Sequence, residues 1–222
     1  MRRQIFATYT GWIILINVIA FLGFLILINF IGDSSAISFV ALQPASIFNG
    51  NYLWTFITSM FMHASVTHLF VNMLSLLFIG SFVERLIGKK RFLGFYLIAG
   101  LFAGLTFVLL AGFFGTSVWG ERIFGNPLAF AVGASGAIFG LGGLLAVLTP
   151  RLKVLVFFII PMPMWMAMVG LIGILWLASL ALPIGIGNTA HFGGLVVGLA
   201  YGFYLKWKYP HRTKMISRYF SR

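Results

Sequence analysis

The sequence predicts an all-α integral membrane protein, a bundle of six transmembrane helices with both termini on the cytoplasmic side. The chain is 61% hydrophobic and only 8% charged, with a mean hydropathy of +1.05, whereas soluble domains carry about 25% charged residues. Its apolar stretches are continuous instead of alternating, which favours helices over the strands of a membrane barrel. Basic residues recur at alternate ends of these stretches, as expected of a multi-pass protein.

Six apolar runs approach the roughly 20 residues that a helix needs to cross a bilayer. The first follows Met1-Arg2-Arg3 and is too long for the apolar part of a typical signal peptide, so we interpret it as a helix. The expected spans are 11–31, 67–82, 92–114, 132–148, 154–182 and 190–205. They form a single membrane domain over residues 1–222.

The basic residues predict the orientation. All of the 15 Lys and Arg residues except Arg122 fall on one side of the expected bundle. They are Arg2, Arg3, Arg85, Lys89, Lys90, Arg91, Arg151, Lys153, Lys206, Lys208, Arg212, Lys214, Arg218 and Arg222. The positive-inside rule makes this side cytoplasmic, in a cell (inner) membrane. The net charge of +12 therefore has a topological cause, and we expect a lipid bilayer around the chain and no nucleic acid as a partner.

Two loops on the opposite side are long for so small a membrane protein. Residues 33–62 include Tyr52 and Trp54 among polar groups, a composition that suits a segment lying in the membrane interface. Residues 115–131 hold Glu121 and Arg122. The chain has no cysteine, which excludes disulfides and thiolate chemistry.

Four polar side chains fall at a common depth in three of the expected helices: His68 and Asn72, Ser135, and His191. Polar residues are costly in lipid-spanning helices, so each is a functional candidate. At about 1.5 Å per residue, each lies roughly 20 to 26 Å from the basic residue that ends its helix on the cytoplasmic side. All four are therefore expected in one layer, in the outer half of the bilayer.

A hydroxyl, two imidazoles and a carboxamide are groups that an acyl-transfer site uses. His68 and Asn72 are four residues apart and share a helix face. Each residue also has a structural interpretation, because a serine in a membrane helix commonly bonds its own backbone, and Asn or His commonly joins two helices. Their common depth weakens that interpretation, but depth alone leaves both open.

Glycines recur at helical spacing in the helices that carry Ser135 and His191. They are Gly133, Gly136 and Gly140 in the first helix and Gly194, Gly198 and Gly202 in the second. Small residues at such spacing let two helix backbones approach closely. His191 is three residues before Gly194 and projects from the same face, so packing through the glycines would bring Ser135 and His191 together.

Taken with these motifs, the chain resembles the rhomboid family of intramembrane serine proteases over nearly its whole length. The matching motifs, in the family's order, are His63-Ala64-Ser65, His68-x-x-x-Asn72, Gly133-Ala134-Ser135-Gly136 and Ala190-His191-x-x-Gly194-x-x-x-Gly198. Glu84 also stands at a family position. The resemblance implies a rhomboid-like bundle and a serine endopeptidase that cleaves transmembrane segments of membrane-protein substrates.

The resemblance also implies the roles of the site residues. Ser135 is the nucleophile, His191 is the general base, and the oxyanion is held by His68, Asn72 and backbone N–H groups around Gly133 and Ser135. Two positions depart from the family pattern. At the first, Thr55 follows Trp54 where the family often has arginine, which leaves open how the first loop is anchored. At the second, Phe139 stands where the family has an aromatic residue, often tyrosine, that packs on the histidine.

Soluble serine proteases orient the histidine with a carboxylate. The three acidic residues here do not suit that role, because Asp33 and Glu121 are assigned to loops and Glu84 is on the wrong face. The sequence therefore predicts a Ser-His dyad. Phe139, one helical turn beyond Ser135, is expected to orient the histidine by packing.

The fifth expected span contains Pro161 and Pro163 in an apolar run with Met and Trp. Proline loosens helix packing, so this span is a candidate lateral gate for substrates, and the family resemblance points the same way. Ordinary kinking of the helix explains the prolines equally well.

Other function classes fit the sequence less well. The alternative is a rhomboid-like pseudoprotease acting as a membrane chaperone or substrate-binding module, but such relatives typically lack the serine or the histidine. A transporter is expected to show inverted repeats or intramembrane charges, and a zinc protease a His-Glu-x-x-His motif. His63, His68 and His191 lack the Cys or carboxylate partners of a zinc site. We expect no metal and no cofactor.

Overall fold

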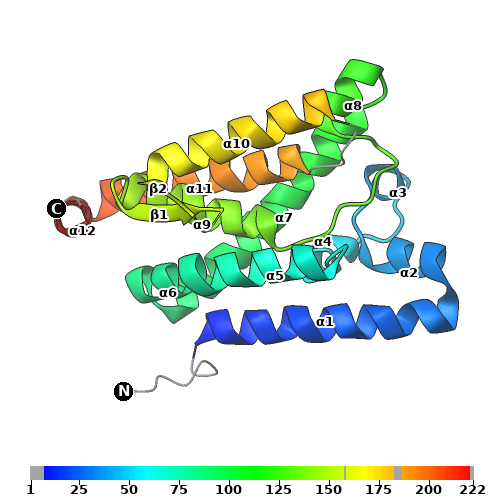
Figure 1. Ribbon diagram of the computed structural model, residues 1–222, viewed down its shortest axis with the longest axis horizontal. Helices are drawn as coiled ribbons and strands as arrows, with labels where there is room; N and C mark the ends of the chain where they lie inside the picture. The colour runs from blue at the N-terminus through cyan, green and yellow to red at the C-terminus, as the bar shows by residue number, and fades with distance from the viewer. Residues whose placement is uncertain (1–7, 158, 183–186, 221–222) are drawn as a thin grey trace.

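The computed structural model describes residues 8–157, 159–182 and 187–220, so Arg2, Arg3 and Arg222 lie outside the described residues. The fold is almost entirely helical (Figure 1). The helices are α1 (Tyr9–Ile31), α2 (Asp33–Val40), α3 (Pro44–Phe48), α4 (Thr55–Thr58), α5 (Val66–Ser75), η2 (Leu76–Gly80), α6 (Ser81–Ile87), α7 (Lys89–Phe114), α8 (Val118–Phe124), α9 (Ser135–Leu148), α10 (Met164–Ala181), α11 (Asn188–Lys208) and α12 (Pro210–Tyr219).

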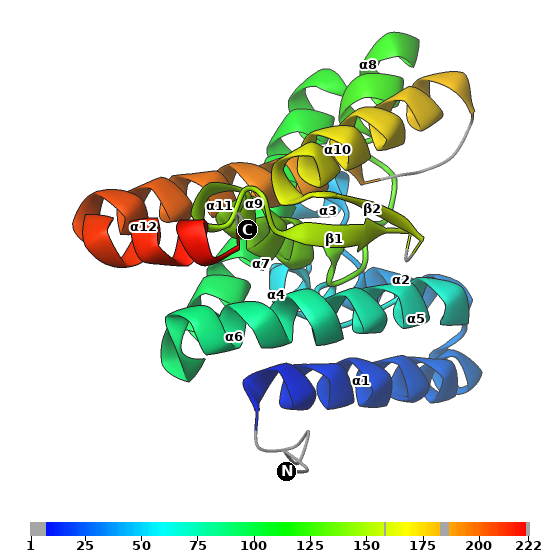
Figure 2. The ribbon, with the colours of Figure 1, turned by 60° about the vertical axis from the view of Figure 1, so that its left-hand side comes forward.

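Within the described residues, four helical segments are long and apolar enough to cross a membrane. Three of them are the single helices α1, α7 and α10. The fourth is Val66–Ile87, a continuous segment in which α5, η2 and α6 follow one another. Figures 1 and 2 show the long helices in one bundle, with α1 along one side and α10 along the other. The prediction of a helical membrane protein is confirmed.

Helix α9 lies at the centre of the bundle, between α7, α10 and α11. Its 14 residues give a length of roughly 21 Å, shorter than the roughly 30 Å hydrocarbon core of a bilayer. Most of its residues are buried against neighbouring helices. Because protein covers it, α9 does not need the length of a lipid-facing helix.

The contact between α9 and α11 is made by backbone atoms. A Cβ atom at Gly194 would collide with the Gly136 carbonyl oxygen, and one at Gly198 would collide with the Gly140 carbonyl oxygen. On the α9 side, a Cβ atom at Gly143 would lie 2.6 Å from the Leu195 carbonyl oxygen. Of the predicted glycines, Gly194 and Gly198 therefore permit the close approach of the two backbones, whereas Gly133 lies before α9 and faces His68.

The fifth expected span requires a correction. Residues 154–182 are not one helix, because β1 (Lys153–Val156) and β2 (Ile160–Pro163) form an antiparallel hairpin before α10 begins at Met164. Pro161 and Pro163 lie in β2, where they pair with Leu155 and Lys153, and they kink no helix. Proline lacks the N–H that a helix interior or a central strand uses, so it is confined to edge strands and element starts.

Residues 33–62 fold into the short helices α2, α3 and α4. The Trp54 indole N–H donates to the Phe39 carbonyl oxygen at 2.8 Å, and the Thr58 hydroxyl donates to the Val40 carbonyl oxygen at 2.9 Å. Thr55, which replaces the family's arginine, is buried and bonds within its own turn. The loop is thus anchored by Trp54 and Thr58 without that arginine.

Glu84 ties the start of α1 to α6. Its Oε1 accepts from the Tyr9 N–H at 3.0 Å, and its Oε2 accepts from the Thr10 N–H at 2.8 Å and the Thr10 hydroxyl at 2.7 Å. The first N–H groups of a helix have no acceptor within the helix, and the positive end of the helix dipole favours a carboxylate there. Glu84 is buried, so its role is structural and lies outside the histidine's surroundings.

Replacing Glu84 should loosen α1. We expect Glu84→Ala to lower the free energy of unfolding by about 2 to 4 kcal/mol, since buried N–H groups lose a charged acceptor, measured by reversible unfolding in micelles. The matched control is Asp33→Ala, which removes an exposed carboxylate from the first turn of α2. Equal stability of the two variants would contradict the anchoring role.

Candidate active site

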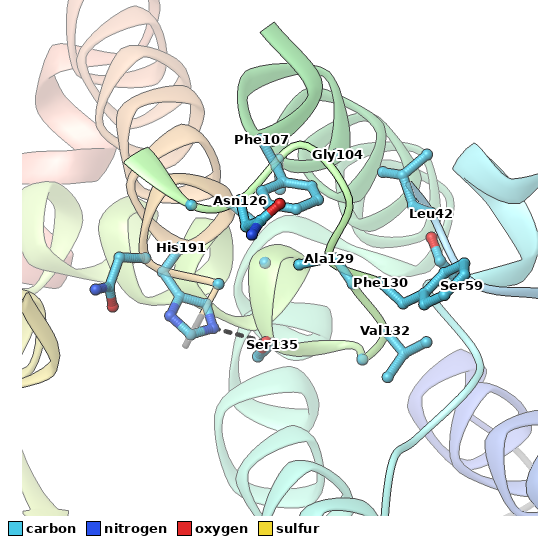
Figure 3. A pocket seen from close by; sticks show the side chains of 18 of the residues that line it. Leu42, Ser59, Gly104, Phe107, Asn126, Ala129, Phe130, Val132, Ser135 and His191 are labelled. Atoms are coloured by element: carbon cyan, nitrogen blue, oxygen red, sulfur yellow. Dashed lines mark hydrogen bonds between the residues drawn. The ribbon is translucent and has the colours of Figure 1, made fainter. Parts of the chain in front are cut away.

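Ser135 and His191 meet where α9 and α11 begin. Ser135 is the first residue of α9, and His191 lies in the first turn of α11. The Ser135 Oγ and the His191 Nε2 are 2.8 Å apart and hydrogen-bonded (Figure 3). The glycine contact between the two helices lies next to this pair, because Gly136 follows Ser135 and Gly194 comes one helical turn after His191.

Phe139 covers the histidine. Its ring stacks on the His191 ring with centroids 4.5 Å apart and an angle of 21° between the planes. Phe139 projects from α9 one turn after Ser135, as the sequence analysis expected. The contact fixes the plane of the imidazole while leaving its edges free for hydrogen bonds.

His68 approaches the pair from α5. The Ser65 hydroxyl caps this helix by accepting from the His68 N–H at 3.1 Å, which explains the serine of the His63-Ala64-Ser65 motif. Gly133 has a φ of +125°, and a Cβ atom there would lie 2.9 Å from the His68 ring. Only glycine allows this conformation and this close approach of the backbone to the ring.

Gly133 was expected to help hold the oxyanion, but its N–H already has a partner. Its N–H donates to the Ser59 carbonyl oxygen at 2.8 Å, so this N–H is not free to hold an oxyanion. The bond, together with the backbone pairing of Leu42 and Ala131, holds the segment before α9 against the first loop. Gly133 thereby positions Ser135 and leaves room for His68.

Asn72 is buried one turn after His68 in α5. Its Nδ2 donates to the His68 carbonyl oxygen at 2.9 Å. This bond uses one of the two amide hydrogens, and Asn72 is not among the residues that line the cleft.

A cleft of about 740 Å³ adjoins the Ser135–His191 pair (Figure 3). Its lining draws on the segment before α5 and on α7, α8, α9, α10 and α11. Apolar lining residues include Leu42, Met60 and Phe107, and polar ones include Ser59, Glu121, Arg122 and Asn126. Such a volume and mixed lining suit a bound segment of polypeptide.

His63 is a neighbour of the site that the sequence reasoning did not assign. It is fully buried, and its ring meets the His68 ring edge to face, with centroids 5.0 Å apart. Burial and the neighbouring His68 lower the pKa of His63 to about 4, so it is neutral near pH 7. Its place in a motif was visible in the sequence, but its contact depends on the path of the loop before α5.

No group of three His, Cys, Asp or Glu side chains within the described residues is arranged to hold a metal ion. His63, His68 and His191 belong to no such cluster.

Comparison with known proteins identifies the family. The family model described as the Rhomboid domain matches residues 50–208. The chain belongs to the rhomboid family. The match covers Ser135, His191 and the surrounding helices, and it confirms the resemblance seen in the motifs.

Several curated relatives of this rhomboid are similar in sequence. It is 32% identical to "RHOMBOID-like protein 6, mitochondrial" of Arabidopsis thaliana over 79% of this chain and 52% of that protein. It is 34% identical to "Rhomboid protein 1, mitochondrial" of Saccharomyces cerevisiae over 67% of this chain and 41% of that protein. It is 31% identical to "Rhomboid protease GluP" of Bacillus subtilis over 86% of this chain and 33% of that protein. The chain thus spans about half or less of the length of these relatives.

The glycine contact predicts a sharp effect of one methyl group. Gly194→Ala places a Cβ against the Gly136 carbonyl oxygen and should lower the free energy of unfolding by about 1 to 3 kcal/mol. The control is Gly170→Ala in α10, where a Cβ meets nothing within 4 Å. Thermal unfolding in micelles separates the two; if both variants unfold at the wild-type temperature, the backbone contact is not what holds α9 to α11.

Proposed function

We propose that this rhomboid is an intramembrane serine endopeptidase that cleaves transmembrane segments of membrane-protein substrates through the dyad of Ser135 and His191. The observation that carries the proposal is the 2.8 Å hydrogen bond between Ser135 Oγ and His191 Nε2 at the wall of a large cleft. A serine used only for packing would bond its own backbone instead of a histidine on another helix.

The chemistry follows from this bond. His191 Nε2 takes the proton of the Ser135 hydroxyl as Oγ attacks the carbonyl carbon of the scissile peptide. The protonated His191 then gives that proton to the leaving amine, which departs as the acyl-enzyme forms. A water molecule, activated in the same way by His191, hydrolyses the acyl-enzyme and restores Ser135.

The negative charge of the tetrahedral intermediate needs donors, since lipid offers none. The His68 ring lies beside Gly133 and lines the cleft, and Asn72 retains one amide hydrogen. The first backbone N–H groups of α9 have no acceptor within the helix, and the helix dipole favours negative charge there. We assign the oxyanion to these groups, with Gly133 as the residue that makes room for His68.

Substrate entry past α10 is supported by how loosely this helix packs. Gly170 and Gly173 have nothing within 4 Å of a Cβ position, and Val169 and Leu177 are exposed. The contact of α10 with Gly142 of α9 is made by the side chain of Met168, which is flexible, and not by backbone. A helix held in this way can shift aside more readily than α11.

A membrane chaperone or substrate-binding module is the alternative, because some rhomboid-like proteins are inactive. The intact Ser135–His191 bond favours the protease, since binding alone does not need an activated hydroxyl. Purified protein incubated with a model transmembrane substrate distinguishes the two. Binding without cleavage would support the alternative.

The dyad is tested by removing each member. Ser135→Ala and His191→Ala should each reduce cleavage of a transmembrane substrate to background, and the double variant should be no slower than either, because the two residues act as one unit. A serine-directed fluorophosphonate should label Ser135 only when His191 is present. Substantial turnover by either single variant would rule the dyad out.

We also propose six spans with both termini cytoplasmic, α9 and α11 completing the four long helical segments. The chain has no native cysteine, so Ser35→Cys and Lys89→Cys each create a unique thiol. An impermeant thiol reagent should label the cysteine at position 35 from outside intact cells, and the one at position 89 only after lysis. Labelling of position 89 from outside would reverse the orientation.

A further inference from the structure

The Ser135–His191 dyad does not explain what binds the second ring nitrogen of His191, Nδ1. If Nε2 accepts the Ser135 proton, the neutral ring carries its own hydrogen on Nδ1. The His191 Nδ1 is buried and has no hydrogen-bond partner among the described residues. Stacking on Phe139 fixes the ring plane, but it distinguishes neither the two nitrogens nor the two flipped orientations of the ring. Something else must hold the required tautomer.

Asn188 stands one helical turn before His191 on α11 and lines the same cleft. Residues three apart lie on the same face of a helix. Asn188 is only 4% exposed, and its Oδ1 is buried and has no hydrogen-bond partner among the described residues. The His191 Nδ1–H, an unpaired donor, and the Asn188 Oδ1, an unpaired acceptor, thus lie on one helix face beside the same cleft.

The orientation of the Asn188 amide is fixed by α10. The Ser179 hydroxyl donates its one hydrogen to the Leu175 carbonyl oxygen at 3.1 Å. Ser179 Oγ can then only accept, and it does so from the Asn188 Nδ2 at 2.7 Å. The same Nδ2 also donates to the Leu175 carbonyl oxygen at 3.4 Å. The NH₂ side of the amide therefore faces α10, and Oδ1 is left for another donor.

Few other acceptors compete. The buried side-chain oxygens that lack a partner in the described part of the chain belong to Asn17, Tyr96 and Asn188. Of these three residues, Asn188 alone lines the cleft beside His191. The backbone carbonyl of Gly187 accepts from the His191 N–H at 3.0 Å.

We propose that Asn188 is the positioning residue of His191, with Asn188 Oδ1 accepting the Nδ1 hydrogen through one bridging water molecule. The two atoms are not in direct hydrogen-bond contact, and a buried water between polar groups joins them at little loss. This role rests on the proposed protease function and adds a neutral third member to the dyad. It also makes the orientation of the base depend on α10, because Ser179 and Leu175 hold the amide.

The test compares near-isosteric replacements of two buried asparagines. Asn188→Leu should lower kcat for a transmembrane substrate on the order of 10 to 100-fold, with KM nearly unchanged, because one buried hydrogen bond that orients the base is lost. Labelling of Ser135 by a fluorophosphonate should slow by a similar factor. The matched control is Asn17→Leu in α1, where the asparagine is also buried but does not line the cleft. This control should keep the wild-type kcat per folded molecule.

Two further variants separate orientation from packing. Asn188→Gln retains the amide hydrogens that donate to Ser179 and Leu175 as well as the acceptor oxygen, and should keep a kcat clearly above that of Asn188→Leu, a rescue that a packing role would not give. Ser179→Ala removes the shorter of the two hydrogen bonds that hold the amide to α10 and should lower kcat several-fold even if Asn188→Leu does not fold.

The outcomes also separate this inference from the protease assignment. A wild-type protein that neither cleaves nor reacts with the fluorophosphonate overturns both. Active wild-type protein with wild-type kcat in Asn188→Leu and Ser179→Ala overturns only the role of Asn188. An equal loss in Asn188→Leu and Asn17→Leu, or no rescue by Asn188→Gln, also overturns it.

Discussion

The close approach of α9 and α11 is the constraint on which the rest of this rhomboid depends. Hydrophobic association does not hold helices together in lipid, because lipid tails are as apolar as leucine, so the helices must gain their contact by packing. Glycines on both faces let carbonyl oxygens of one helix lie against the Cα atoms of the other. Ser135 is the first residue of α9 and His191 lies in the first turn of α11, so the helix contact also brings the Ser135 Oγ to the His191 Nε2.

Elements outside α9 and α11 hold the residues around Ser135 and His191 in place. The loop before α5 holds the segment before α9 through the Ser59 carbonyl, and Gly133 gives the His68 ring its place. Glu84 fastens α1 at the far end of α6 without touching the site. In contrast, α10 contacts α9 through the side chain of Met168 and is hydrogen-bonded to Asn188 of α11 through Ser179, so the helix proposed to move aside is also the one that holds Asn188.

A neutral amide suits a histidine buried in a membrane protein. In a soluble serine protease, a buried aspartate orients the base and stabilises its charged form. A carboxylate within the bilayer would have to be desolvated even when the histidine is neutral, which is costly in a medium of low dielectric constant. An asparagine held by two hydrogen bonds fixes the ring without adding a charge, and stacking on Phe139 supplies the rest of the orientation.

The sequence by itself determined the membrane class, the helical content and the pairing of Ser135 with His191. Hydropathy reflects the solvent of the chain, and glycine spacing reflects the contact face of a helix, so both are local properties. Only the tertiary structure decided the rest. It paired residues 153–156 with residues 160–163 as two strands, directed the Gly133 N–H to the Ser59 carbonyl and brought Ser179 to Asn188. These depend on contacts between residues distant in the chain, which no local pattern encodes.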